Sequence, residues 1–312
     1  MNLLRTLLLL TALFCGSLIA SQAQAQISCN VTFNTLAFPT TMDVLPGASF
    51  DTASTVASSC TGITGTTKVL LCYALNSGTY PVSGTQRQMG SGTNRLLFQA
   101  YVDSGRLITW GTSGTGLLSV VLTATAPSAT TSYYGRVAAS QPAAVPAAYS
   151  TTMTVTVSGT AYTGATPACP TAALATFTFN ATGTVISSCN ATATNLVFPS
   201  TSFFTANIDG TSTVRVTCTN TTPYHVRLSG GTVAATDPAQ RKMSLGVNQI
   251  TYGLYRDTAR SLGWGSTDNT NTLDATGTAS ATNHTVYGRI PPQSSVPPGP
   301  YTDTVVVTVS FL

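Results

Sequence analysis

The sequence repeats one pattern of residues along its length. The pair Ser28-Cys29 returns as Ser188-Cys189, and Tyr149 returns as Tyr301, so the offset between the copies stays between 152 and 160 residues. The other matched positions are Leu36-Ala37-Phe38-Pro39 with Leu196-Val197-Phe198-Pro199, Cys60 with Cys218, Arg87 with Arg241, Asp103 with Asp257, Arg106 with Arg260, Trp110 with Trp264, and Arg136 with Arg289. A repeat of this length and regularity indicates two homologous domains of ordinary size.

Both copies show the patterns of β-strands. Residues 213–218 alternate between polar and apolar types, and residues 304–309 are a run of β-branched residues; both patterns are typical of strands. Clusters of Gly, Pro, Asn and Ser interrupt the runs about every ten residues, as they do in β-sandwiches. We therefore expect an all-β protein with two antiparallel β-sandwiches and almost no helix.

The low charge excludes other classes of protein. Only 7% of the residues are charged and none of them is glutamate, whereas long amphipathic helices need charged residues on their solvent face. Disordered chains combine low hydrophobicity with high net charge, but here 43% of the residues are hydrophobic and the formal net charge is +4. The basic residues are scattered singly, so no cluster supplies the footprint of a nucleic-acid-binding surface.

The N-terminal residues 1–25 have the pattern of a secretory signal peptide. Arg5 precedes an apolar run over residues 7–20, and Ala23-Gln24-Ala25 forms a small-residue cleavage site. A transmembrane anchor is the weaker interpretation because the run is shorter than the roughly 20 residues that span a bilayer. We expect an exported protein whose mature form begins near Gln26.

Removal of the signal peptide removes Cys15 and leaves an even number of cysteines, which in an exported chain indicates disulfides. Cys29 with Cys60, and Cys189 with Cys218, occupy equivalent places in the two copies, so each pair is expected to join the first two strands of its domain. Cys72 and Cys169 have no counterparts; a bond between them is one interpretation, and their connectivity stays open. Metal ligation is disfavoured because the sequence has no C-x-x-C motif and no nearby pair of histidines.

The second copy carries several further motifs, among them Arg241-Lys242-Met243, Trp264-Gly265 and Tyr287-Gly288-Arg289-Ile290. With these motifs, residues 177–312 resemble the spore coat protein U domain found in subunits of archaic, Csu-type chaperone–usher pili. Residues 29–158 match more loosely, and a two-domain chain of this kind resembles the tip adhesin of such pili.

The resemblance implies a fold, an arrangement of domains and a set of partners. It implies immunoglobulin-like sandwiches, with an adhesin domain over residues 26–173 and a C-terminal pilin domain over residues 174–312 that lacks its last strand. A periplasmic chaperone fills the open groove first, and the donor strand of the next pilin subunit replaces it at the outer-membrane usher. The expected location is the tip of a pilus, or fimbrium, at the cell surface.

Two features of the sequence agree with a tip subunit. Only Gln26, Ile27 and Ser28 precede Cys29 in the expected mature chain, which leaves no donor segment, and no further strand follows residues 305–311.

Residues 174–185 have two interpretations. Their alternating Phe177 and Phe179 either complete the sheet of the first domain or form the first strand of the second.

We expect no enzyme activity and no cofactor. The sequence lacks the common nucleophile, zinc and phosphate-loop motifs. His225 and His284 are interpreted as exposed residues of strands. Asp103 with Arg106 could be mistaken for an acid–base pair, but it recurs as Asp257 with Arg260, so a structural turn is expected.

Surface-binding residues are sought among the apolar residues that only the first copy has. This comparison selects five of them in expected loops: Val44, Leu45, Leu117, Leu118 and Val145. Apolar residues in exposed loops mark interaction sites, and an adhesin would use them to attach to a hydrophobic or host surface and to form biofilm.

Other interpretations remain. Leu118, Val120 and Leu122 alternate and fit a buried strand as well as a loop. A carbohydrate-binding adhesin on the same fibre would need aromatic and polar residues in one groove. The candidates for such a groove are Tyr80, Asn94, Tyr133 and Tyr134. A structural coat or surface protein with the same fold is the remaining alternative.

Overall fold

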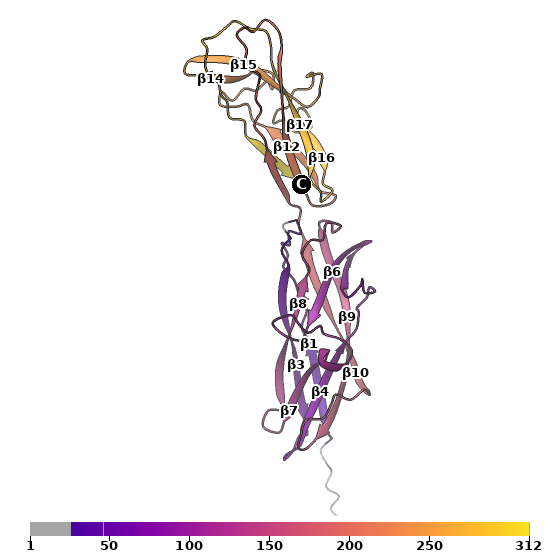
Figure 1. The fold of residues 1–312 in the computed structure, drawn as a ribbon. Coiled ribbons are helices and arrows are strands. Elements are labelled where there is room, and N and C mark those ends of the chain that lie inside the picture. The colour runs from indigo at the N-terminus through magenta and orange to yellow at the C-terminus, as the bar shows by residue number, and fades with distance from the viewer. Residues whose placement is uncertain (1–25, 46, 312) are drawn as a thin grey trace, which may run out of the picture.

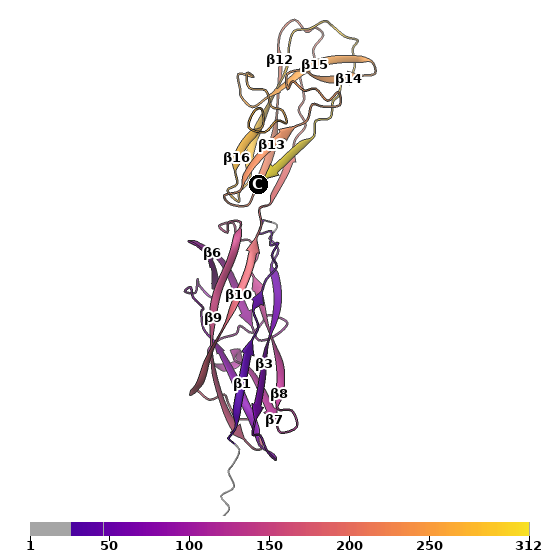
Figure 2. The ribbon, with the colours of Figure 1, turned by 180° about the vertical axis from the view of Figure 1, so that it is seen from behind.

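The computed structural model describes residues 26–45 and 47–311. The expected signal peptide, with Cys15, lies outside the described residues. The chain forms two immunoglobulin-like β-sandwiches that follow each other end to end (Figures 1 and 2). Within the described ranges the one helical element is the 3₁₀ turn η1, Gly114–Gly116, so the expected all-β fold is confirmed.

The first sandwich contains ten strands in one continuous, curled sheet. Its main path runs in the order β1-β3-β8-β6-β5-β9-β10-β2, and β4 lies between β7 and β9. The strands are β1 (Ser28–Phe33), β2 (Leu36–Ala37), β3 (Phe50–Thr61), β4 (Lys68–Leu75), β5 (Arg87–Ser91), β6 (Asn94–Tyr101), β7 (Leu118–Thr123), β8 (Ser128–Val137), β9 (Ala147–Tyr162) and β10 (Ala173–Val185). Because β10 pairs with β9 on one side and with β2 on the other, the two layers of this sandwich are joined.

The pairing of strand β10 shows which of the two domains is completed by residues 174–185. It runs antiparallel to β9, with Phe179 opposite Met153, and parallel to β2, with Ala181 beside Leu36. Phe179 is buried in the first core and Phe177 packs against it. The hypothesis that this segment completes the first sandwich is therefore confirmed. As a unit of packing the first sandwich extends to Val185.

The second sandwich has two separate sheets. One has five strands in the order β11-β12-β17-β15-β14, and the other has three in the order β16-β13-β18. The strands are β11 (Cys189–Ala193), β12 (Ile208–Cys218), β13 (Pro223–Leu228), β14 (Arg241–Leu245), β15 (Asn248–Tyr255), β16 (Leu273–Thr276), β17 (Thr282–Ile290) and β18 (Val307–Phe311). Within the described residues no strand joins these sheets in the way that β10 joins the layers of the first sandwich.

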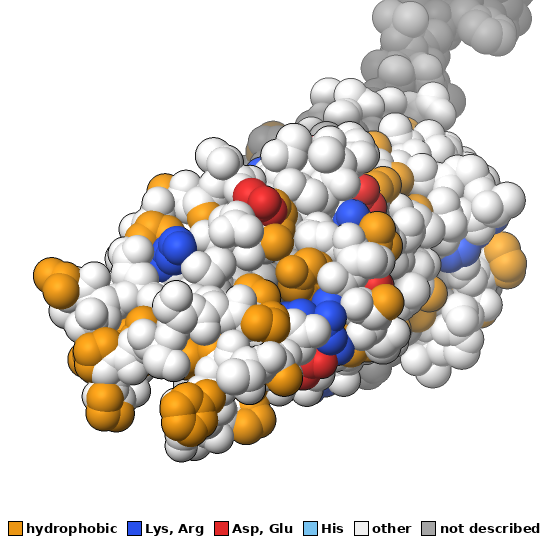
Figure 3. All heavy atoms as spheres, turned by 90° about the horizontal axis from the view of Figure 1, so that it is seen from above, with side chains coloured by type: hydrophobic (Ala, Val, Ile, Leu, Met, Phe, Trp, Pro, Cys, Tyr) orange, Lys and Arg blue, Asp and Glu red, His pale blue; other side chains and the backbone are white. Residues whose placement is uncertain are grey.

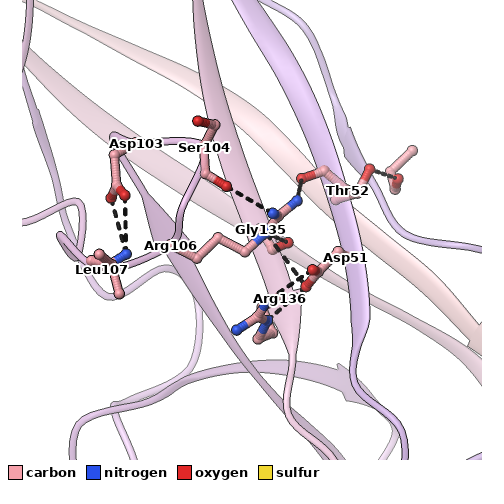
Figure 4. A network of polar contacts seen from close by, with 9 residues as sticks. Asp51, Thr52, Asp103, Ser104, Arg106, Leu107, Gly135 and Arg136 are labelled. Carbon is pink, nitrogen blue, oxygen red and sulfur yellow. Dashed lines mark hydrogen bonds and ion pairs between the residues drawn. The ribbon is translucent and has the colours of Figure 1, made fainter.

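The matched residues of the repeat form the same local structures in both sandwiches. Figure 4 shows the first copy, where the Asp103 carboxylate accepts the backbone N–H of Leu107 and the Arg106 guanidinium donates to the Gly135 carbonyl. Beside it, Arg136 makes a two-point contact with Asp51. The second copy repeats this arrangement with Asp257, Arg260, Arg289 and Asp209. The interpretation of Asp103 with Arg106 as a structural turn is confirmed.

Buried arginines form a second matched structure. The Arg87 guanidinium donates to the carbonyls of Leu75 and Trp110, and Arg241 donates to those of Leu228 and Trp264. Burial lowers the pKa of Arg87 to about 10, which leaves it protonated at neutral pH. Each arginine thus satisfies carbonyls that would otherwise be buried without a donor.

All three disulfides form. Cys29–Cys60 joins β1 to β3 and Cys189–Cys218 joins β11 to β12, as expected from the repeat. Cys72–Cys169 also forms. It connects the buried β4 to the segment that leads into β10, and so it holds the approach of β10 to the first sandwich.

Candidate functional site

A groove of about 1050 Å³ opens between the two sheets of the second sandwich. Its walls are mostly the apolar side chains that would form the centre of a closed sandwich. They include Leu196, Phe198, Phe204, Val214, Leu228, Met243, Ile250, Leu254, Val286, Ile290, Val296, Tyr301, Val305 and Val307. Viewed onto the end of the second sandwich, hydrophobic side chains lie open on the surface with few charged ones among them (Figure 3). A groove of this size, lined by many apolar side chains with polar groups among them, indicates a binding site.

The equivalent place in the first sandwich is filled by β10. Leu36, Tyr149 and Met153 are no more than 1% exposed there, whereas their counterparts Leu196, Tyr301 and Val305 are only partly buried. Equivalent strands and segments form the walls in both copies, so the difference in burial follows from the presence of β10 in one and the absence of an equivalent described strand in the other.

Backbone groups along the groove differ in the same way. Phe38 donates its N–H to the Thr182 carbonyl of β10 at 2.7 Å, but the matching Phe198 N–H makes no backbone hydrogen bond within the described residues. The same holds for the N–H groups of Asp303 and Val305. Residues 303–306 form no strand, although the matching residues lie inside the long β9. The groove therefore has two unpaired edges, and such edges accept a further strand.

Asp303 is the charged residue of the groove wall. The Asp303 carboxylate accepts hydrogen bonds from the Tyr252 hydroxyl at 2.7 Å and from the backbone N–H of Thr232 at 2.7 Å. Burial raises the pKa of Asp303, but the hydrogen bonds from Thr232 and Tyr252 outweigh it, so its pKa lies below the ordinary value. The groove thus carries a negative charge at neutral pH.

The structure places the five expected surface-binding residues in or next to the first core. Val44 and Leu118 are each only 5% exposed, so neither side chain is available to a surface, and the expectation for these two is wrong. Leu118 lies in β7 with the buried Leu122, as the alternative interpretation predicted. Leu45, Leu117 and Val145 are partly buried.

Three of these five residues, Val44, Leu45 and Val145, also lie at the end of the first sandwich that faces the second. The Ile186 N–H donates to the Met42 carbonyl, and the Ser188 hydroxyl donates to Asp43 at 2.6 Å. Ala147, close to Val145, pairs with Val185 at the end of β10. Val44, Leu45 and Val145 are thus near the junction between the sandwiches.

The opposite, outer end of the first sandwich consists of three loops, residues 62–67, 124–127 and 163–172. They are neighbours because Lys68 of β4 pairs with both Thr123 and Tyr162. None of the three loops contains a charged residue. Their exposed side chains are mainly alanine, proline and threonine, including Ala124, Ala126, Pro127, Ala165, Pro167 and Ala168. We call this surface the outer loop surface.

The remaining candidates do not form a site. Tyr133 is fully buried, Tyr134 is next to it in β8 and contacts Arg106 on the other face, and Tyr80 packs on Arg95. These tyrosines therefore share no groove. His225 and His284 are in strands as expected, but they are partly buried and bound to Asp274 and Tyr224, which corrects their expected exposure.

The described part of the chain shows neither a cluster of metal-ligating side chains nor a membrane-spanning helix. No group of three or more His, Cys, Asp or Glu side chains there is arranged to hold a metal ion. No helix there is long and apolar enough to cross a membrane.

Comparisons with known sequences agree with the repeat. A sequence profile described as the Spore Coat Protein U domain matches residues 16–156 and 175–308. The second match begins inside β10, so this strand belongs to the second copy in sequence and to the first sandwich in space. A relative from Myxococcus xanthus, Protein U, is 32% identical over 108 residues, which are 33% of this chain and 60% of that protein.

A solved structure with a similar fold comes from a pilus. It is a chain of the CsuC–CsuE chaperone–tip adhesion subunit pre-assembly complex from the archaic Csu pili of Acinetobacter baumannii. It is 17% identical, with a TM-score of 0.54, and the match covers 91% of this chain and 100% of that one. The CupB6 tip adhesin from Pseudomonas aeruginosa is 8% identical, with a TM-score of 0.41 and coverage of 90% and 93%.

Proposed function

The chain belongs to the spore coat protein U domain family, and we propose that it is a non-enzymatic adhesin subunit of a chaperone–usher pilus. It is exported through the periplasm and displayed on the cell surface at the tip of the fibre. The all-β fold that it shares with a chaperone-bound tip adhesion subunit supports this assignment. Its three disulfides are consistent with an oxidising compartment.

The observation that carries the proposal is the unequal filling of two matched grooves. The first is completed within the chain by β10, and the second is open and bordered by unpaired backbone groups. An open groove of this kind is an aggregation hazard. In the proposed function a periplasmic chaperone covers it first, and a donor strand from the next subunit then takes its place at the outer-membrane usher.

The direction of β10 supports assembly in a line. β10 enters the first sandwich at the outer loop surface and leaves it at Val185, where the second sandwich begins (Figure 1). A strand inserted in the same direction into the second groove would leave that sandwich at the end remote from the first. The next subunit would then continue the line, and the outer loop surface would remain free at the tip.

The outer loop surface is the proposed attachment site, in place of the loops expected from the sequence. Its loops contain no charged residue, and Lys68, which borders them, donates to the Gly164 carbonyl, so contact with a hydrophobic or host surface requires little removal of water from ions. Each buried apolar side chain contributes on the order of 1 kcal/mol or more, and many pili acting together strengthen attachment and support biofilm formation.

Charges placed on the outer loop surface are expected to reduce attachment. Cells whose pili carry the triple change Ala124→Asp, Ala126→Asp and Ala165→Asp should attach to plastic at least about tenfold less than cells with the unchanged protein. All three side chains are exposed in loops, so pilus assembly, measured by immunoblotting of sheared fibres, should be unaffected.

The matched control places the same charges at the junction end of the same sandwich. Ala48, Ala139 and Ala143 are also exposed, and their replacement by aspartate should leave attachment within about twofold of the unchanged protein. Equal attachment by the two triple variants would contradict the proposed attachment site.

A further inference from the structure

The two grooves differ in chemistry at their middle. Where the first sandwich has Phe98 and Thr151, the second has Tyr252 and Asp303. Thr151 is 4% exposed and its hydroxyl accepts the N–H of Thr79. In the second sandwich the Asp303 carboxylate holds the matching loop through Thr232 and also binds the added hydroxyl of Tyr252. The position of the neutral Thr151 in the filled groove is thus occupied by the charged Asp303 in the open groove.

The two oxygens of this carboxylate are used unequally. Asp303 Oδ1 accepts the Thr232 N–H at 2.7 Å, the Thr232 hydroxyl at 2.6 Å and the Thr304 N–H at 2.8 Å. Asp303 Oδ2 accepts one hydrogen bond, from the Tyr252 hydroxyl. A carboxylate oxygen has about two acceptor sites, so Oδ2, which lies beside Gly231, retains one site for a further donor, and Asp303 lines the open groove.

The register of β10 identifies the residue of an inserted strand that would meet this oxygen. Ala181 of β10 lies directly opposite Thr151 of β9, and both side chains are buried. A strand inserted into the second groove in the same register would place one residue opposite Asp303. Side chains at directly opposed positions have Cβ atoms about 4.5–5.5 Å apart, which is within reach of a hydrogen bond from a hydroxyl group.

We propose that Asp303 is a specificity-determining residue of the second groove, and that it selects a partner strand with a hydrogen-bond-donating side chain opposite it. This inference rests on the proposed function, because it requires that the groove accept a strand. The selected chemistry is a small hydroxyl residue such as threonine at the place that Ala181 occupies in β10.

The physical reason is the cost of covering a charge. A strand in the groove excludes water from Asp303, and losing the water that binds the open acceptor site of Oδ2 costs free energy unless another donor replaces it. A threonine hydroxyl would replace the lost water at Oδ2, whereas valine, which has the same shape, would not. An aspartate would place a second negative charge beside the first and is expected to be rejected. The chain's own β10, with alanine there, is a poor match for its own second groove.

Peptides provide the test. The probe is the β10 sequence from Ala173 to Val185, synthesised with threonine, valine or aspartate in place of Ala181, and titrated against the full chain by calorimetry. The threonine peptide should bind about tenfold more tightly than the valine peptide, because its hydroxyl adds a hydrogen bond to a charged group. The aspartate peptide should bind at least tenfold more weakly than the valine peptide.

A double variant supplies the matched control. Asp303→Thr with Tyr252→Phe recreates the pair found in the first sandwich, and it should bind the threonine and valine peptides within about twofold of each other. Asp303→Asn, which keeps the shape of the side chain, should by itself reduce the rejection of the aspartate peptide, so the test does not depend on the double variant folding.

The outcomes distinguish the role of Asp303 from the insertion of a strand into the second groove. Binding of all three peptides with equal affinity to the unchanged protein would overturn the role of Asp303 and leave strand insertion intact. Failure of every peptide to bind would contradict strand insertion itself, and with it this part of the proposed function.

Discussion

Replacing Phe179 by alanine is expected to lower the free energy of unfolding of the first sandwich by about 3–5 kcal/mol, the range for deletion of a buried phenylalanine. Phe179 comes from β10, yet its ring is 5% exposed in the first core and stacks on Trp110 and Phe33 at centroid distances of 6.0 and 5.7 Å. Urea denaturation followed by tryptophan fluorescence would measure the change, since Trp110 is in direct contact.

The neighbouring residue provides the control for this change. Thr178 is in the same strand but is exposed on the outer face, so Thr178→Ala should change the free energy of unfolding by less than about 0.5 kcal/mol. If the two variants were equally stable, β10 would not complete the first core as described.

Supplying the second groove with a strand is expected to raise the stability of the second sandwich by about 5 kcal/mol. The design joins a copy of residues 173–185, with threonine in place of Ala181, to the C-terminal residue through a short flexible turn. Its three inward apolar side chains, the counterparts of Phe177, Phe179 and Val185, would each contribute about 1.5–3 kcal/mol on burial. Ordering of the added strand offsets part of this gain. Differential scanning calorimetry should show the transition of the second sandwich moving to higher temperature.

A matched fusion separates strand insertion from the effect of added chain length. In this fusion both phenylalanines of the appended copy are replaced by serine, and the transition should remain where it is in the unfused protein. An equal shift in both fusions, or none in either, would contradict the view that the groove lacks an apolar strand.

Residues that serve the fold in both copies could be predicted from the sequence. Arg87 and Arg241 are matched, and both bind carbonyls of the same two segments. The paired turns and the disulfides of the repeat follow the same logic, because equivalent positions in homologous sandwiches meet equivalent partners.

The place of β10 could not be predicted, because its alternating phenylalanines fit either groove and the repeat assigns it to the second copy. The mistaken assignment of Val44 and Leu118 has a related cause. Apolar residues gained by one copy indicate either a surface or a fuller core, and here β10 enlarges the first core: Met42 bridges to Val185, close to the buried Val44.

Asp303 and Tyr252 are not found by a criterion that selects only residues gained in the first copy. The signal was present, since Thr151 and Phe98 are replaced in the second copy by a carboxylate and a phenol. The resemblance implied an open groove, but the sequence does not show which backbone groups along its edges are unpaired, because a strand with a partner and one without it can have the same residues.

Hydrogen–deuterium exchange, with and without the threonine-containing peptide, tests most directly whether the second groove is open and accepts a strand. The amides of Phe198, Asp303 and Val305 should exchange rapidly in the protein alone and become protected when the peptide is present, because their N–H groups then gain partners. The matched amides in β9, and that of Phe38, should be protected in both conditions. Slow exchange at Asp303 and Val305 in the protein alone, or no added protection with saturating peptide, would contradict the account.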